Sequence, residues 1–468
     1  MRRLKQIAAW GLPFGAAACI ILALCGADDA LAFMRRHAAV GVVFALSIVS
    51  LFAAVRGRRN VSALIMHLGF ALALFGWAFN AMFGPTSGYV RLRTGQYGGI
   101  GRSAVQQDLP QFLVRLDDFK IDYWPDTGTV RQYTSKVHIG PYSETDDGLE
   151  AQEISVNHPA IVGSVGGGYW WVYQSSYEQL QNPHTGDPLY FTILQCVCDI
   201  GLPFAALGGV LLLVGALMYA VAGWRVRDGR GRDGLCPVLG RDEARPSQYR
   251  DGDLAVEQCY PRWLTILYAL SFAGSFAMLV HRGLTTGHAP MQNMYEFLMC
   301  IAAAMPVLTW FSARRGERTF LQDAFLQAFV LVPVAFFMDG SAKHLMPALQ
   351  SPFFVPHVGA YVLGYVLLVR AALGAGVRLV GAGFFLMTVG LVLGSAWGKV
   401  CWGNWWMFDP KEMWSLATWL VYAAYFHAEA RLSPKARRIF LAIGAAMIVL
   451  TLTWVNLSRL FPGMHSYA

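Results

Sequence analysis

The stretch IGLPFAALGGVLLLVGALMYAVA, residues Ile200–Ala222, contains no charged residue. A membrane-spanning helix needs about 20 apolar residues, within a range of roughly 17–25, so this run predicts a transmembrane helix. Similar runs recur on both sides of it, and eleven candidates follow by the same measure. They are approximately Ala8–Cys25, Ala39–Val55, Ser62–Phe83, Ile200–Ala222, Leu264–His281, Tyr295–Phe311, Phe320–Met338, His357–Leu373, Leu379–Trp397, Trp414–Phe426 and Ile439–Trp454. The predicted fold class is therefore a polytopic α-helical membrane protein of about 11 spans.

Composition and charge agree with this class. Of the 468 residues, 55% are hydrophobic and 14% charged, and the mean hydropathy is +0.41. The net charge of +8 comes from basic residues grouped between apolar runs, which is the pattern of topology signals, and nucleic acid is not an expected partner. With the amino terminus inside, Arg56–Arg59, Arg314–Arg318, Arg370–Arg378 and Arg431–Arg438 fall on the cytoplasmic face. The first run resembles a signal peptide, but we expect it to be retained because no cleavage site is clear and more spans follow.

Polar segments divide the chain into two membrane modules. Residues 84–191 contain alternating runs such as FLVRLDDFKIDYW and YWWVYQSSY, which predict a small β-rich domain on the outer side. Residues 224–261 are rich in Gly, Arg and Asp without an apolar period, which is typical of a cytoplasmic linker. We therefore predict a first module over residues 1–223, including the outer domain, and a second over residues 262–468.

The eight cysteines exclude several site types. None of them forms a Cys-x-x-Cys pair, so a thioredoxin-like redox motif, a zinc ribbon and a self-carried c-type haem site are all absent from the sequence. If the function needs reduced thiols on another protein, a separate partner has to supply that chemistry.

Ionisable groups inside apolar spans are costly and are usually functional. By depth, His67 and His427 lie toward the cytoplasmic leaflet, whereas His357 and His465 lie at the outer surface. Two facing neutral imidazoles are what bis-axial haem ligation requires. The alternative for each histidine is a plain hydrogen bond to a neighbouring helix. His344, near the outer face, is a reserve candidate.

A tryptophan-rich loop at about residues 396–419 separates two of the spans. In SAWGKVCWGNWWMFDPKEMWSLATW, Ser395–Trp419, six of the 15 tryptophans fall within 23 residues. An interfacial aromatic belt explains two or three of them, whereas a shelf of indoles accommodates a flat apolar macrocycle. Lys399, Lys411 or Arg459 could meet its propionates. Asp409 and Glu412 around Lys411 are either part of this site or a local ion-paired turn.

The loop resembles the tryptophan-rich WWD signature of haem-handling proteins of cytochrome c biogenesis. Trp402-Gly403, Trp406, Asp409–Glu412, Trp414 and Thr418-Trp419 match it, with Phe408 in place of the usual tryptophan before the aspartate. The runs around His357, His427 and His465 resemble the CcsA (ResC) branch. MHLGFALALFG around His67, together with RQYTSKVHI and YQSSY, resembles CcsB (ResB). The whole chain thus resembles the fused System II cytochrome c synthases, CcsBA.

This resemblance implies transport of haem b across a bacterial cytoplasmic membrane and its thioether attachment to the Cys-x-x-Cys-His motif of an apocytochrome c, assisted by thiol-reducing thioredoxin-like membrane partners. It implies His67 and His427 as inner haem-iron ligands, and His357 and His465 as outer ones. The catalytic candidates are His357, His465, Trp402, Trp406 and Asp409, and the further haem-binding candidates are Trp397, Trp405 and Trp414. The rival hypotheses are a haem exporter or chaperone without ligase activity, and a quinone-linked membrane cytochrome.

Overall fold

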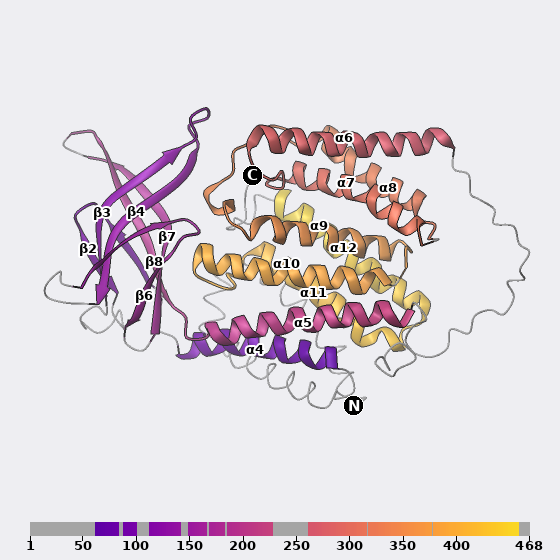
Figure 1. Cartoon of the computed structure of the whole chain (residues 1–468), viewed down its shortest axis with the longest axis horizontal. Coiled ribbons are helices and arrows are strands. Elements are labelled where there is room, and N and C mark those ends of the chain that lie inside the picture. Colours follow the sequence, from indigo (N-terminus) through magenta and orange to yellow (C-terminus); the bar gives the residue numbers. More distant parts are fainter. Residues whose placement is uncertain are drawn as a thin grey trace, which may run out of the picture.

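The computed structural model describes residues 61–83, 88–100, 112–141, 148–165, 168–182, 185–227, 261–315, 317–376 and 378–457. Within them, an α-helical bundle carries a β domain at one end (Figure 1). The first two predicted spans, most of the predicted linker, and the carboxyl-terminal residues Arg459 and His465 lie outside the described residues. The architecture confirms the predicted fold class.

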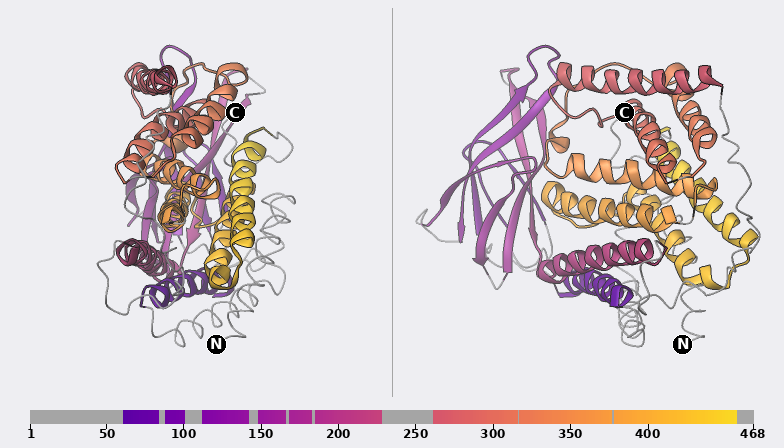
Figure 2. Two further views of the ribbon diagram at one scale, coloured as in Figure 1. Left: turned by 90° about the vertical axis from the view of Figure 1, so that its right-hand side faces the viewer. Right: turned by 45° about the vertical axis from the view of Figure 1, so that its right-hand side comes forward.

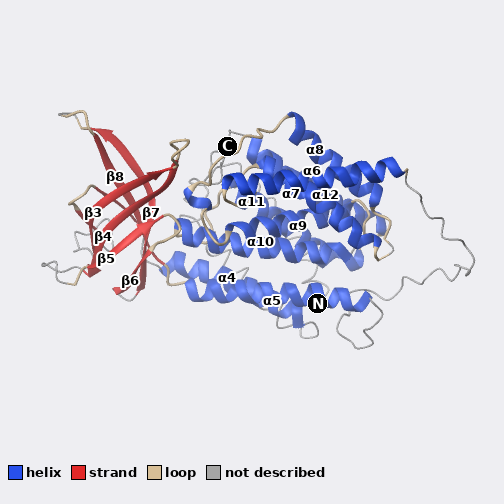
Figure 3. Ribbon diagram, turned by 45° about the horizontal axis from the view of Figure 1, so that its top comes forward, coloured by secondary structure: helices blue, strands red, loops and turns tan. Residues whose placement is uncertain are grey.

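Nine α-helices are described, each over one of the remaining predicted spans. They are α4 (Val61–Phe83), α5 (Leu202–Arg227), α6 (Arg262–Thr286), α7 (Met294–Ala313), α8 (Phe320–Phe336), α9 (Phe354–Ala372), α10 (Arg378–Trp402), α11 (Pro410–Ala428) and α12 (Pro434–Leu457). Seven of them are long and apolar enough to cross a membrane; α8, with 17 residues, and α11, whose first turn is charged, are not among the seven. Figure 3 shows the helices, in blue, running side by side away from the strands.

Helices α4 and α5 pack at backbone contact because glycines line their interface. A Cβ added to Gly69 would lie 2.4 Å from the backbone nitrogen of Leu212, and one added to Gly208 would lie 2.4 Å from that of Ala73. Small residues at a helix–helix interface let membrane helices approach closely without a hydrophobic driving force. The pair then packs through α5 against α10, which joins the two predicted modules.

The β domain consists of two four-stranded antiparallel sheets. Their strand orders are β1-β8-β7-β6 and β2-β3-β4-β5. The strands are β1 (Gly88–Leu92), β2 (Tyr97–Ile100), β3 (Phe112–Tyr123), β4 (Val130–Pro141), β5 (Glu150–Ser155), β6 (Ala160–Val165), β7 (Gly168–Gln181) and β8 (Pro188–Cys198). Alternating apolar side chains from both sheets form one core, which includes Phe112, Trp170 and Leu194. The last strand runs to Cys198, seven residues beyond the predicted end at Phe191, because its apolar alternation continues to the helix junction.

The β domain is docked on the ends of the helices, as the views in Figure 2 also show. The side-chain amide of Asn157 donates to the carbonyl oxygens of Pro347, Ala348 and Gln350 at 3.0–3.1 Å. These residues belong to a short 3₁₀ segment, η1 (Pro347–Leu349), and its cap before α9. The two N–H groups of this buried amide are shared among the three carbonyl oxygens, which fixes the loop in place. The β domain therefore helps to shape the end of the bundle where α9 begins.

Candidate functional site

Two predicted ligands, His67 and His427, lie beside each other at the end of the bundle opposite the β domain. His67 is near the start of α4 and His427 is in the last turn of α11, and these two helices come from different predicted modules. Their ring centroids are 5.7 Å apart with an angle of 61° between the planes. The structure thus brings together two imidazoles that are 360 positions apart in the chain.

Hydrogen bonds to the helix backbone orient both rings in the same way. Nδ1 of His67 is 2.6 Å from the carbonyl oxygen of Ala63, and Nδ1 of His427 is 2.8 Å from that of Ala423. Because a carbonyl oxygen only accepts, each Nδ1 carries the proton. In the neutral ring the lone pair is then on Nε2, the nitrogen suited to an axial position on iron.

His67 and His427, called the inner histidines after their predicted depth, are not part of a conventional metal cage within the described residues. Among the described residues, no group of three or more His, Cys, Asp or Glu side chains is placed to hold a metal ion. Structural zinc takes four such ligands, and catalytic zinc usually three with an open position. Two imidazoles without carboxylate or thiolate instead fit a metal that already has four equatorial ligands, as haem iron has.

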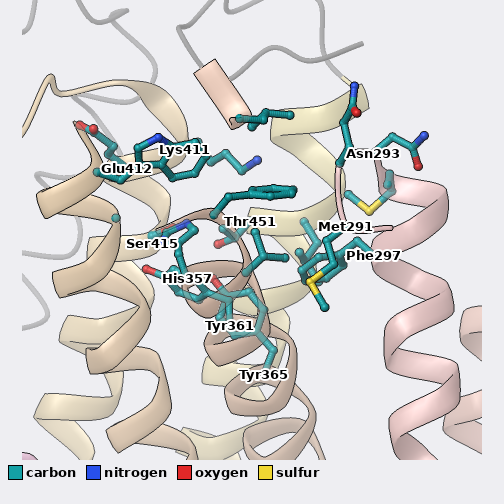
Figure 4. Close-up of a pocket in the computed structure, with 18 of the residues that line it drawn as sticks. Met291, Asn293, Phe297, His357, Tyr361, Tyr365, Lys411, Glu412, Ser415 and Thr451 are labelled. Atoms are coloured by element: carbon teal, nitrogen blue, oxygen red, sulfur yellow. The ribbon is translucent and has the colours of Figure 1, made fainter. Parts of the chain in front are cut away.

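A cavity of about 290 Å³ lies at the opposite end, where α9 begins (Figure 4). This volume is at the lower end of the range typical of ligand pockets. Figure 4 shows Lys411 and Glu412 on one side of the cavity, with His357, Tyr361 and Tyr365 on the other. Residues from α7, α9, α10, α11 and α12 line it, together with the segments before α7 and α9 and the loop between α10 and α11. Its walls include Met291, Phe297, Met338, Leu349, Leu391, Trp397, Trp406 and Thr451.

His357 is held in this cavity by α10. Its Nδ1 donates to the carbonyl oxygen of Gly390 at 2.8 Å, so its lone pair is on Nε2, as in the two inner histidines. The ring contacts Tyr361 and Trp397 edge-on, with centroid distances of 5.1 and 5.7 Å. A Cβ on Gly394 would lie 2.6 Å from Cε1 of the imidazole. The ring therefore occupies space that exists only because residue 394 has no side chain.

The tryptophans of the loop do not form one continuous shelf. Trp397 and Trp406 line the cavity, and Trp402 stacks behind Trp397 at a centroid distance of 6.1 Å. The Trp405 indole points away, and its N–H donates to Asp199 at 3.0 Å. Trp414 is buried in the helical core. Of the five indoles predicted to contact haem, two face the cavity directly and one supports them from behind.

The charged residues of the loop fall into two groups. Asp409 caps α11 by accepting the backbone N–H of Lys411 at 2.9 Å, and Glu412 accepts the backbone N–H of Met407 at 2.8 Å. Both carboxylates thus order the local turn, and Lys411 and Glu412 also line the cavity. Lys399, one of the three residues predicted as alternatives to meet a haem propionate, instead forms a buried ion pair with Asp199.

Phe408, which replaces the usual tryptophan of the motif, has a left-handed backbone with φ of 58°. This conformation costs a residue with a side chain of order 1–3 kcal/mol, and surrounding contacts must maintain it. Its ring is buried and meets Trp77 of α4 at 5.8 Å between centroids. The loop therefore turns on a strained residue that is held by the first module.

The reserve candidate His344 has a different role in the structure. Its Nε2 lies 2.7 Å from the Asp126 carboxylate, and its ring stacks on Trp124 with centroids 4.3 Å apart. This hydrogen bond lowers the pKa of Asp126. His344 does not line the cavity and instead connects the β domain to the segment before α9.

Cys196 and Cys198 are buried in the β domain, and their burial raises the pKa of both thiols. Neutral buried thiols are poor nucleophiles.

One predicted ligand stays a prediction, and two residues of the site were not predicted from the sequence. The outer partner His465 lies outside the described residues, so its pairing with His357 stays a prediction. Sequence reasoning missed Gly394, whose role depends on which face of α10 meets α9. It also missed Asp199, which looks like an ordinary residue between a strand and a helix. The one available signal was its position at the β8–α5 junction, three residues before the first residue of α5.

Fold and site together define a multi-pass membrane protein with a docked β domain and histidines at two ends of the bundle. Comparison with known families makes this class specific. Residues 26–189 match the ResB-like family, and residues 375–462 match the cytochrome C assembly protein family. The chain thus combines a ResB-like amino-terminal domain with a CcsA-type carboxyl-terminal domain, an arrangement consistent with the fused CcsBA proteins.

Relatives of the second module have the same association. The cytochrome c biogenesis protein CcsA of Synechococcus sp. (strain RCC307) is 29% identical over 249 residues, which cover 41% of this chain and 80% of that protein. The CcsA protein of Prochlorococcus marinus (strain MIT 9303) is 27% identical over 266 residues, covering 44% and 83% respectively. The family matches and these relatives support a role in cytochrome c maturation.

Proposed function

We propose that the protein carries haem b across the membrane and attaches it covalently to apocytochrome c. The observation that carries this proposal is the adjacency of His67 and His427, each with Nδ1 tied to its own helix backbone. Two imidazoles oriented in this way are suited to hold haem iron as substrate. The alternative, a histidine that only hydrogen-bonds a neighbouring helix, would not require a second imidazole beside it.

The outer cavity is the proposed site of attachment. His357 would hold the haem iron together with His465, while Trp397 and Trp406 contact the porphyrin and Lys411 offers a positive charge to a propionate. Each thiol of the acceptor adds across a haem vinyl group, sulfur to one carbon and hydrogen to the other, so no leaving group is released. The protein supplies mainly position, because holding thiol and vinyl in register lowers the entropic cost of the reaction.

The cellular setting follows from the same proposal. The helices would lie in a bacterial cytoplasmic membrane, with the β domain and the outer cavity facing the periplasm or its equivalent. The partners are the apocytochrome, whose Cys-x-x-Cys-His peptide reaches the cavity from outside, and thioredoxin-like membrane proteins that keep its cysteines reduced. The described cysteines of this chain are buried, which supports assigning the thiol chemistry to another protein.

A haem exporter without ligase activity is the main rival. The docked ResB-like domain favours the synthase, because a protein that only exports haem has no need for a second domain on the rim of the outer cavity. A quinone-linked cytochrome would retain stoichiometric haem at both ends and turn over by redox chemistry, whereas a synthase releases its haem to the product.

Co-expression with an apocytochrome c reporter tests the proposal, in a host that lacks its own maturation system. We expect haem to stay on the reporter after denaturing electrophoresis. A reporter with serines in place of its two motif cysteines is the control and should stay unlabelled. Haem-loaded protein with an unlabelled wild-type reporter would contradict the synthase and favour the exporter.

A further inference from the structure

The tryptophan loop of the second module is held by a buried carboxylate of the first. Asp199 directly follows β8, at the junction where the β domain joins α5. One of its oxygens, Oδ2, accepts hydrogen bonds from Nζ of Lys399 and from the Trp405 indole N–H, both at 3.0 Å. The other, Oδ1, accepts the backbone N–H of Gly201 at 3.1 Å. Both oxygens therefore have partners, and two of these three belong to the second module.

Further contacts at the same junction hold the loop against the β domain. Nζ of Lys399 also donates to the carbonyl oxygen of Gly403 at 3.1 Å, and it lies 5.9 Å from the ring centroids of Trp171 and Tyr173. Gly403 turns with φ of 78°, and a Cβ there would lie 2.9 Å from the Tyr173 ring. Figure 1 shows this side of the β domain next to the end of α10. The loop thus rests directly on β7 and β8.

Burial of this ion pair points to a role in orientation. The side chains of Lys399 and Asp199 are only 6% and 5% exposed. Removing two charges from water costs about as much as their attraction returns, so such a pair adds little net stability. The pair does fix the orientation of the tryptophan loop. The Trp405 indole is anchored to Asp199, and the next residue, Trp406, lines the cavity.

We propose that Asp199 is a positioning residue that holds the tryptophan loop in its haem-binding form by accepting the Trp405 N–H beside Lys399. This inference rests on the proposed function, because it assigns the outer cavity to haem attachment. It gives the ResB-like module a direct part in shaping that cavity. Breaking the contact should release the loop while the helices and the inner histidines remain in place.

Two matched double variants of the full chain separate the hydrogen bond from the charges. Asp199→Leu with Lys399→Met removes both charges and the acceptor, whereas Asp199→Asn with Lys399→Met removes both charges but keeps a carbonyl oxygen for Trp405. Neither leaves a buried charge unpaired, which would destabilise the protein by itself. Trp405→Phe removes the donor alone. Asp187→Asn, at an exposed turn of the same domain, is the control.

Two readouts are needed, and the first does not depend on haem. In hydrogen–deuterium exchange of the purified protein, we expect amides of residues 402–409 to exchange at least about tenfold faster in the leucine variant and in Trp405→Phe, but not in the asparagine variant or the control. Maturation of the reporter should fall about tenfold in the same two variants. The absorption spectrum of haem at the inner histidines should not change.

The outcomes are decisive in both directions. Normal exchange in the leucine variant would overturn the inference, and so would equal defects in the leucine and asparagine variants. Faster exchange with normal maturation would overturn the functional part. Parallel assay of His357→Ala separates these results from failure of the proposed function, because that variant loses maturation only if the outer cavity is the site of attachment.

Discussion

The two ends of the bundle present histidines in contrasting ways. At the inner end, His67 and His427 are each tied to a carbonyl of their own helix, so the pair forms as soon as α4 packs near α11. At the outer end, His357 is held by a neighbouring helix, α10, and the loop beside it is held by the β domain. Each inner ring is thus oriented by its own helix, although the pair forms only where α4 and α11 meet, whereas the outer ring and the loop beside it are oriented by neighbouring elements.

Removal of the outer histidine is expected to have the largest effect. His357→Ala should reduce maturation of the reporter by about 100-fold or more, because the iron loses one of the groups that position it. Haem should still copurify through the inner pair. Added imidazole should restore part of the activity by filling the vacated axial position. Normal yield from this variant without imidazole would show that the two ends do not differ as proposed.

Gly394→Ala sharpens the comparison because it leaves the imidazole present but displaces it. The added methyl group would lie 2.6 Å from the His357 ring, so the ring must move. A misplacement of about 1 Å costs roughly 100-fold in well-aligned reactions, and we expect a loss of about tenfold to 100-fold in maturation.

The matched control for this substitution is Gly381→Ala in the same helix, where an added Cβ meets no atom within 4 Å. It should mature the reporter normally. The haem spectrum in each variant reports whether His357 remains a ligand. Equal maturation and equal haem spectra in the two alanine variants would refute the role of Gly394 in leaving space for the His357 ring.

Much of the depth pattern could be predicted from the sequence, and the lateral contacts could not. His67 lies five residues into one predicted span and His427 closes another, so the direction of the spans predicts both toward one leaflet. Which helices are neighbours is set by packing, which hydropathy does not encode. The orientations of the Trp405 and Trp406 side chains could not be predicted either, because adjacent residues in an irregular loop follow no period. The ion pair of Lys399, one of three candidates for a propionate, could not be predicted either, because its partner Asp199 comes from the other module.

The tryptophans should differ in a graded way. Trp406→Ala removes a cavity wall that buries up to about 150–250 Å², and haem occupancy at the outer end should fall about tenfold. Trp402→Ala removes only the support behind Trp397, so its effect should be smaller. Titration of haem into the purified variants measures both. A larger loss of haem occupancy from Trp402→Ala than from Trp406→Ala would contradict the assignment of Trp406 as cavity wall and Trp402 as support.

The smallest effect is expected where the β domain meets the segment before α9. The hydrogen bond from His344 lowers the pKa of Asp126, so its stabilisation is present above the unfolded carboxyl pKa of about 3.9 and is lost as pH falls through the lower folded value. Asp126→Asn should lower the melting temperature by about 1–2 °C, because the carboxylate is exposed. Thermal unfolding at pH 7 and pH 3 checks this. A shift that is larger at pH 3 would contradict the sign.

The central claim is that haem iron is held at the inner end by His67 and His427 independently of the outer cavity. Absorption and electron paramagnetic resonance spectra of the purified His357→Ala protein test it most directly, because the outer ligand is absent. We predict a low-spin bis-imidazole haem signal that disappears when His67→Ala or His427→Ala is added. A bis-imidazole signal that survives either addition would contradict the account.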